Sequence, residues 1–211
     1  MLRKLLIVPF FGKLPDWYPK WAESVAGLKE YGYDLFPTTD LQGFNKRSLR
    51  TLGFETPIVE GTGKVWDYRA SFGLMFQELL KDYDFWGTTD LDVVYGNIEH
   101  FYPDDLIKDY DIITDEDNYI GGHFTLYRNN PEVNNLFSEH EGWLKILLDP
   151  FASGWVEKEY SELALRRVRV LCKRIQASRD NTGLEFKNGC LFQHGVEVGL
   201  AHFRDQKRWV L

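Results

Sequence analysis

The chain has 211 residues, of which 44% are hydrophobic and 27% charged. This composition excludes extended disorder, and the length is sufficient for one domain with a substantial core. Acidic residues outnumber lysine and arginine by 32 to 25, which gives a formal net charge of −7. That balance argues against a dedicated nucleic-acid binder, because such proteins need a basic surface.

Two cysteines, Cys172 and Cys190, are too few for a disulfide scaffold or a four-cysteine zinc site. The apolar run at the start is interrupted by Pro9 and stopped by Gly12, which does not fit a signal peptide. No stretch approaches the roughly 20 apolar residues that cross a bilayer. We therefore expect a soluble, cytoplasmic protein.

The first forty residues predict a strand, a helix and a second strand. Residues 5–11 form an apolar run typical of a strand buried on both faces. Asp16 can cap a helix over about residues 16–30, and residues 33–36 form the next short strand. A mainly parallel α/β sheet begins in this way.

The middle of the chain predicts further strands around an acidic region. Residues 41–64 are polar and contain several glycines, so we expect an irregular excursion there. A helix with an apolar stripe opens at Asp67, and one strand is expected over residues 83–95. Residues 111–114 and 123–127 are candidate strands on either side of an acidic loop.

The last part of the chain predicts a long amphipathic helix over about residues 156–177, followed by an apolar tail that packs onto the domain. The region is rich in cations: Arg166, Arg167, Arg169, Lys173, Arg174 and Arg179. They are compatible with peripheral contact to an anionic membrane surface through residues 166–179. A solvated helix face is the simpler explanation, since cations are favoured toward a helix C-terminus.

The sharpest chemical feature is Asp90-Leu91-Asp92, at the end of an apolar, aromatic strand. Residues i and i+2 of a strand point to the same side, so both carboxylates can converge on one Mg²⁺ or Mn²⁺ ion. Such an ion can neutralise a diphosphate leaving group as a Lewis acid. The alternative is that one aspartate caps a turn while the other is solvated.

Acidic residues crowd this region, with twelve of them from Asp82 to Asp117 against one basic residue, Lys108. We expect most of these acids to be solvated, including the loop residues Asp115 and Glu116. His123 follows two glycines and is a candidate acid/base group, because its ordinary pKa lies near neutrality. A purely structural histidine is an equally good reading of that position.

A set of short blocks is spread over most of residues 5–130 and the last dozen residues. The blocks are PFFGKLPDW at 9–17, DYRASFG at 67–73, YDFWGTTDLDVVYGN at 83–97, GHFTLYRN at 122–129, HF at 202–203 and QKR at 206–208. Together they resemble a bacterial family of GT-A-type glycosyltransferases or glycosyltransferase-like proteins. That family has an Asp-x-Asp motif and belongs to surface or capsular polysaccharide assembly.

The resemblance implies a GT-A-like α/β fold, a Rossmann-related and mainly parallel sheet flanked by helices, in one domain over residues 1–211. About residues 1–130 would bind the nucleotide sugar and metal, and about residues 131–211 would form the acceptor side and tail. It implies sugar transfer from a UDP- or GDP-sugar to a glycan or lipid-linked hydroxyl, with Mn²⁺ or Mg²⁺ as cofactor. The location implied is the cytoplasm or the inner face of the membrane.

The resemblance also implies roles for individual residues. The matched metal ligands are Asp90, Asp92 and His202. The residues matched to the nucleotide sugar are Phe11, Gly12, Asp40, Asp67 and Arg69, the last as a partner for phosphate. The candidate catalytic residues are His123 and Asp115.

Two other functions stay open at this stage. A haloacid-dehalogenase-type phosphatase would use Asp90 as nucleophile and Asp92 as acid/base. That motif normally ends the first strand of its core domain, whereas here two strand-helix units precede it. A non-catalytic protein could keep the same fold and only bind a nucleotide or glycan.

Overall fold

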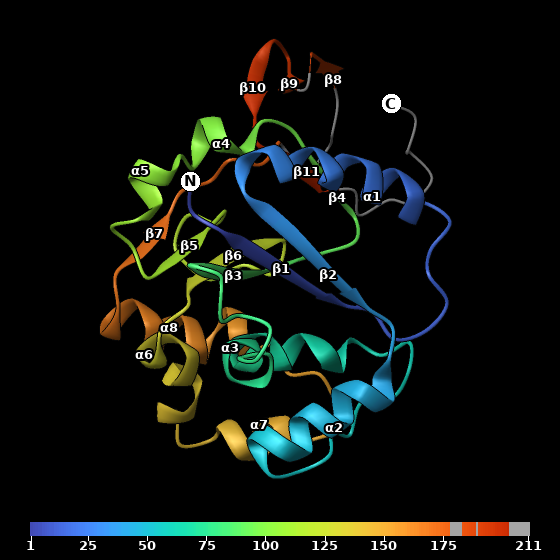
Figure 1. Ribbon diagram of the computed structural model, residues 1–211, viewed down its shortest axis with the longest axis vertical. Coiled ribbons are helices and arrows are strands. Elements are labelled where there is room, and N and C mark those ends of the chain that lie inside the picture. Colours follow the sequence, from blue (N-terminus) through green and yellow to red (C-terminus); the bar gives the residue numbers. More distant parts are fainter. Residues whose placement is uncertain (178–182, 189, 203–211) are drawn as a thin grey trace.

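The computed structural model describes residues 1–177, 183–188 and 190–202, and a mixed α/β sheet lies at its centre (Figure 1). The sheet has six strands in the order β2-β1-β3-β6-β5-β7. Its strands are β1 (Lys4–Pro9), β2 (Tyr33–Thr38), β3 (Phe85–Thr89), β5 (Ile112–Thr114), β6 (Phe124–Arg128) and β7 (Val170–Cys172). β6 is antiparallel to both neighbours and the other pairs are parallel, which confirms the predicted, mainly parallel sheet.

Helices cover both faces of this sheet (Figure 1). One layer holds α1 (Tyr18–Ala26), the 3₁₀ helix η1 (Gly27–Tyr31), α4 (Ile98–Phe101) and α5 (Asp104–Ile107). The α-helices of the other layer are α2 (Leu41–Leu52), α3 (Phe72–Met75), α6 (Pro131–Asn135), α7 (Trp143–Leu148) and α8 (Glu159–Arg167). Its 3₁₀ helices are η2 (Gly63–Ser71), η3 (Leu136–Glu139) and η4 (Trp155–Glu157).

The core has two layers because each strand sends alternate side chains to opposite faces. In β1, Leu5 and Ile7 enter the layer under α2 and α3, while Leu6 and Val8 enter the layer under α1. Both layers are buried, which explains why the strand is apolar at successive positions rather than alternating.

The smaller strands lie around the C-terminal part of the chain. β4 (Val93–Tyr95) pairs antiparallel with β11 (Leu200–His202), and β8 (Leu184–Lys187), β9 (Cys190–Gln193) and β10 (Val196–Val198) form a three-stranded sheet. Leu191 and Leu200 are fully buried. The described part of the tail therefore packs onto the rest of the protein, as its apolar residues predict.

Two predictions about the first half of the chain were wrong in detail. The excursion expected over residues 41–64 contains the twelve-residue helix α2, whose N-terminus is capped by the Asp40 side chain accepting from the Gly43 amide at 2.8 Å. The first helix begins at Tyr18 and has no side-chain cap, so Asp16 does not start it. Burial of Phe44 against the rings of Tyr68, Phe72 and Phe76 stabilises α2.

The long helix expected over residues 156–177 was also wrong. α8 ends at Arg167, and Val170–Cys172 instead forms β7, which pairs parallel with β5. The apolar residues of this segment fit a helical stripe, but β5 offers backbone partners that a helix cannot use. Non-local pairing has therefore overridden the local pattern.

The cations of this segment consequently do not share one helix face. Arg167 pairs with Glu139 at 2.8 Å, Arg169 with Asp111 at 3.5 Å, and Arg174 with Asp117 at 3.5 Å. Arg179 lies outside the described residues. The expectation of membrane contact through a basic helix thus loses its structural basis, and no described helix is long and apolar enough to cross a bilayer.

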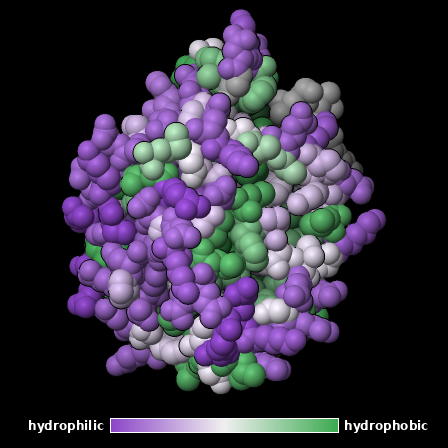
Figure 2. Space-filling model, viewed as in Figure 1, coloured by the Kyte–Doolittle hydropathy of each residue, from purple (hydrophilic) through white to green (hydrophobic). Residues whose placement is uncertain are grey.

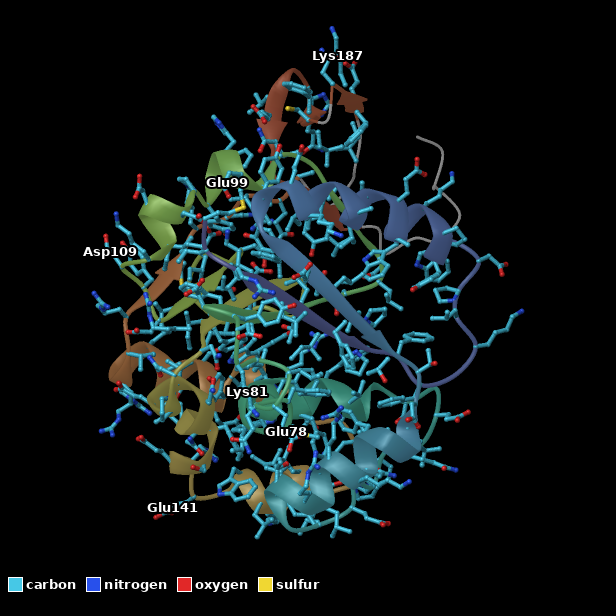
Figure 3. The ribbon with its side chains drawn as sticks, viewed as in Figure 1. Glu78, Lys81, Glu99, Asp109, Glu141 and Lys187 are labelled. Carbon is cyan, nitrogen blue, oxygen red and sulfur yellow. The ribbon has the colours of Figure 1, made fainter. Side chains whose placement is uncertain are left out.

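The surface is mostly polar, with a hydrophobic area near the middle of the face shown in Figure 2, over the edge strand β2. Pro37 removes one backbone donor from this edge, and Asp34 places a half-exposed charge on it. Both features oppose pairing with another chain. Charged residues labelled in Figure 3, such as Asp109 and Glu141, are exposed on the outside of the molecule.

A buried cation links the start of the sheet to α5. Lys4 is fully buried, donates to Oδ1 of Asp104 at 2.6 Å and to the Tyr31 carbonyl at 3.0 Å, and lies over the ring of Tyr33. Partial burial alone would raise the pKa of Asp104, but the bonds from Lys4 and the Leu2 amide outweigh it and lower that pKa. The ionised pair therefore stabilises the native state.

We expect Asp104→Asn to lower the free energy of unfolding at pH 7 by about 1–2 kcal/mol, since a charged hydrogen bond is replaced by a neutral one. A carboxyl whose pKa is lowered by folding contributes stability above its unfolded pKa and loses it as pH falls through the folded value. The difference from wild type should therefore shrink below about pH 4 in urea titrations. Asp105→Asn, at an exposed pair, is the control, and an acid-independent difference contradicts the assignment.

Candidate functional site

A cleft of about 700 Å³ opens beyond the C-terminal ends of β1 and β3. β1 is followed in the chain by β2 on one side of it, whereas β3 lies on its other side, so the strand order reverses here. Crevices at such reversal points are where open α/β sheets bind ligands. The cleft is lined by the end of β1, the turn after β3, the start of β6 and residues 152–157.

The single strand expected over residues 83–95 is broken at Asp90-Leu91-Asp92, which forms the turn between β3 and β4. The indole of Trp21 donates to the Asp90 carbonyl at 3.0 Å, and that of Trp17 donates to the Leu91 carbonyl at 3.1 Å. These bonds satisfy two backbone acceptors that have left the sheet. Both aspartates line the cleft, and their role as metal ligands stays a prediction.

Arg69 reaches Asp90 from η2. Its Nη2 forms an ion pair with Oδ1 of Asp90, and the two side chains are 12% and 24% exposed. The backbone of Gly122 lies against this guanidinium, and a Cβ at that position would overlap Nη1 of Arg69. A glycine is therefore needed at 122 for the arginine to lie across the floor of the cleft.

The carboxylate of Asp67 is buried and bonded within the protein, rather than exposed for contact with a nucleotide sugar. Its carboxylate is 1% exposed and accepts from Lys64 Nζ at 3.0 Å, from the Ser153 amide and hydroxyl at 2.9 and 3.1 Å, and from the Gly154 amide at 3.0 Å. Lys64 also donates to the carbonyls of Ile146 and Phe151 at 2.6 and 3.1 Å. This network fixes both η2, which carries Arg69, and the loop that forms one wall of the cleft.

The structure adds two lining residues that the sequence did not single out. Trp66 is 57% exposed at the cleft, and the exposed Glu157 lies near Gly122. Phe10, from the loop after the first strand, lines the same cleft. The exposure of Trp66 points to a binding site only because its neighbours Lys64 and Asp67 are buried, and the sequence does not show that burial. Aromatic faces of this kind can stack on a base or a sugar ring.

A second polar cluster lies next to Asp90. The pairing of β3 with β6 places His123 beside Asp90, whose amide donates to the His123 carbonyl at 3.3 Å. Nδ1 of His123 lies 3.3 Å from Oε1 of Glu116, and Gln176 donates to Oδ2 of Asp115 at 3.0 Å and to Oε1 of Glu116 at 3.2 Å. His123 lines the cleft, so it is the member of the cluster that can meet a ligand.

The expectation that Asp115 and Glu116 are solvated was wrong. Asp115 is fully buried and Glu116 is 4% exposed, whereas Asp117 projects into solvent. Strand β5 ends just before them and packs beside β6, which turns both carboxylates inward toward His123. Sequence alone could not show this, because acidic loops are usually exposed.

The two carboxyl groups of this cluster, Asp115 and Glu116, have pKa values shifted in opposite directions. Burial, together with the charges of Glu116 and Asp90, raises the pKa of Asp115 to about 7. Burial acts in the same direction on Glu116, but the hydrogen bonds from His123, Tyr119 and Gln176 and the charge of His123 together outweigh it and lower the pKa of Glu116 to about 2. Burial lowers the pKa of His123, yet the hydrogen bond to Glu116 and the neighbouring carboxylates produce a net rise.

Three further predicted site residues, Phe11, Gly12 and Asp40, lie outside the lining of this cleft. The ring of Phe11 is buried against Phe44 at 5.2 Å, Gly12 adopts a φ of 133° beside it, and Asp40 caps α2. The backbone of His202 pairs with Val93, the residue after Asp92, while its side chain is outside the described part of the structure. The nucleotide and metal roles of these residues stay predictions.

The donor set fits a divalent cation held jointly with a ligand. Within residues 1–177, 183–188 and 190–202, no three His, Cys, Asp or Glu side chains form a ready metal site. Asp90 and Asp92 nevertheless bring two hard carboxylate ligands to one cleft, and such ions often take their remaining ligands from phosphates and water.

Comparison with known proteins identifies the family. A family described as a family of unknown function, DUF6625, matches residues 6–148, which is more than half of the chain. The protein belongs to DUF6625. The matched region includes the whole Asp90-Leu91-Asp92 turn, Arg69 and His123. No match to this DUF6625 protein was found among curated proteins.

A solved structure shares the fold of the DUF6625 protein. It is the crystal structure of a glycosyltransferase involved in the glycosylation of the major capsid of PBCV-1. The two are similar over 97% of this chain and 95% of that chain, with a TM-score of 0.60 and 12% sequence identity. The fold of the DUF6625 protein is thus glycosyltransferase-like.

We expect Asp67→Ala to lower the free energy of unfolding by about 3–5 kcal/mol, because it leaves the Lys64 ammonium buried without its carboxylate. Urea unfolding followed by tryptophan fluorescence measures this loss. Arg50→Ala removes an exposed ion pair with Glu78 and should cost at most about 1 kcal/mol. A loss from Asp67→Ala no larger than that of the control would show that the buried network does not support the cleft wall.

Proposed function

We propose that the DUF6625 protein is a metal-dependent glycosyltransferase that moves a sugar from a nucleotide-diphosphate donor to a hydroxyl of a glycan or glycolipid. The observation that carries this proposal is the Asp90-Leu91-Asp92 turn at the reversal point of the sheet, inside a cleft. The glycosyltransferase-like fold supports the same class of reaction.

The charge of the cleft argues for a cation alongside the donor. Among the described residues that line it, Arg69 is the only lysine or arginine, whereas Asp90, Asp92 and Glu157 are acidic, as is Asp67, which the buried Lys64 already neutralises. A diphosphate would meet a negative surface at this place. Asp90 and Asp92 would hold Mn²⁺ or Mg²⁺, with His202 as a further candidate ligand. When bound, that ion supplies positive charge to the diphosphate leaving group.

The remaining lining residues suit the other parts of the donor. The guanidinium of Arg69 can donate to phosphate oxygens, which its planar fork matches. The exposed face of Trp66 and the ring of Phe10 offer stacking surfaces for the base or the sugar. A donor of either nucleotide type, UDP or GDP, is compatible with these contacts.

His123 is the proposed proton acceptor. In the transfer, the acceptor oxygen bonds to the anomeric carbon, the bond from that carbon to the phosphate oxygen breaks, and the hydroxyl proton must leave. His123 lines the cleft and is oriented by Glu116, as a histidine base requires. Asp115 is fully buried, so its proposed role is to set the charge around His123 rather than to contact the acceptor.

Nucleotide binding provides the first test. We expect UDP or GDP to bind only with Mn²⁺ or Mg²⁺ present, and Asp92→Asn to weaken that binding at least about tenfold, since one anionic ligand is lost. Isothermal titration calorimetry measures both effects. Asp117→Asn changes an exposed carboxylate outside the cleft and should have no effect.

Three outcomes would contradict the proposal. Equal nucleotide affinity with and without divalent cation would exclude the metal-assisted mechanism. Release of phosphate from simple phosphoesters, lost in Asp90→Asn, would favour the phosphatase instead. Binding without turnover of any UDP- or GDP-sugar would favour the non-catalytic nucleotide binder.

Turnover tests the role of His123 separately. We expect His123→Gln to keep nucleotide affinity and to lower the rate of sugar transfer or donor hydrolysis about 10²–10⁴-fold, the usual contribution of a general base. A panel of UDP- and GDP-sugars, analysed by mass spectrometry, provides the rates. The exposed His100→Gln is the matched control, and a rate in His123→Gln equal to that control would exclude the assignment.

A further inference from the structure

The ion pair between Arg69 and Asp90 occupies the carboxylate that the proposed function assigns to a cation. Arg69 is 12% exposed and Asp90 24%, so solvent screens the pair only partly. Among the described residues, the one side-chain hydrogen bond of Arg69 goes to Oδ1 of Asp90. A guanidinium has five N–H donors, so Arg69 can also donate to the oxygens of a phosphate in this cleft.

A divalent cation and this guanidinium compete for the same charge. Both are attracted to the carboxylate of Asp90, and both are positive, so they repel each other when held a few ångströms apart in a partly desolvated cleft. Binding of the cation to Asp90 therefore favours departure of Arg69. The reverse also holds, because an arginine on Asp90 lowers its affinity for a cation.

The local structure lets the guanidinium move while its backbone stays fixed. η2 is anchored by the Asp67–Lys64 network two residues before Arg69, whereas the end of the Arg69 side chain is held by Asp90. Gly122 leaves room beside the guanidinium, with Oε1 of Glu157 3.6 Å from where its Cβ would lie. Rotation of the long side chain can thus carry the charge along the cleft without rebuilding the wall.

We infer that Arg69 is an exchangeable counter-ion, bound to Asp90 until a divalent cation replaces it and then transferred to the donor diphosphate. This inference rests on the proposed function, since it needs both ligands in this cleft. It makes the two binding events cooperative. The diphosphate draws Arg69 away from Asp90 and so raises the affinity for the cation, and by linkage the cation raises the affinity for the diphosphate.

Mn²⁺ alone is the probe for the first half of the exchange. We expect Arg69→Gln and Gly122→Ala to bind Mn²⁺ roughly tenfold more tightly than wild type, because both remove a positive charge from Asp90. Arg69→Gln deletes the charge, whereas Gly122→Ala keeps it and displaces the guanidinium sterically. Electron paramagnetic resonance of free Mn²⁺ during titration of the full chain measures the affinity.

The control is Arg128→Gln, at a partly buried arginine that pairs with Asp111 at 3.2 Å outside the cleft. Its Mn²⁺ affinity should equal that of wild type. Circular dichroism melting of each variant verifies folding before titration. Tighter binding in both cleft variants, with no change in the control, is the expected pattern.

UDP and GDP, each titrated with saturating Mg²⁺, probe the second half. Arg69→Gln should bind the better nucleotide more weakly, by roughly tenfold, since it loses a charged contact with phosphate. Cation and nucleotide affinities then change in opposite directions, which a purely structural role of Arg69 does not produce.

Failure of the exchange is distinguishable from failure of the proposed function. If wild type binds Mn²⁺ and nucleotide but either cleft variant binds Mn²⁺ no more tightly, the exchange is wrong and the proposed function stands. Nucleotide affinity unchanged in Arg69→Gln also overturns it. If neither wild type nor any variant binds Mn²⁺ or nucleotide, both the exchange and the proposed function are overturned.

Discussion

The structure depends on balancing negative charge at the C-terminal ends of β3 and β5. Asp115 and Glu116 are buried there, and Asp90 lies beside them with its side chain 24% exposed. Each is compensated differently: Asp90 by the guanidinium of Arg69, Glu116 by His123, and Asp115 by a pKa raised to about 7 that lets it be neutral. Buried carboxylates are tolerated only with such compensation, so these pairings fix the inner wall of the cleft.

The buried pair of Lys64 and Asp67 holds one wall of the cleft in place. Lys64 and Asp67 bond to one another and to five groups of the segment from Ile146 to Gly154. The segment that bears Arg69 and the loop opposite it are therefore held by one network, far from the sheet's own hydrogen bonds. On the other side, Trp17 and Trp21 attach the aspartate turn to α1. Walls held in this way would let the Arg69 guanidinium change partners, as we propose, without moving the rest of the cleft.

The local sequence pattern predicted much of this fold but fewer of the contacts in the candidate site. The apolar runs of β1 and β3 and the carboxylates after β3 could be foreseen, because burial on both faces leaves a strong signature in sequence. β7 could not, since its conformation is set by pairing with β5, fifty-odd residues earlier. Burial of Asp115 and Glu116 escaped prediction for the same reason: their partners, His123 and Gln176, are brought to them by tertiary structure.

The net charge of −7 also gains a structural meaning. The acids near the cleft are not a general repulsive surface, because those that are buried are already compensated within the fold. Arg69, the single arginine among the described lining residues, already pairs with Asp90. The negative charges of Asp92 and Glu157 therefore exceed the positive charge at the cleft. Under the proposed function, Asp90 and Asp92 would hold a cation at this negative cleft, and its positive charge would let an anionic ligand bind there. The negative sign of the cleft is therefore compatible with the negative substrate that we propose.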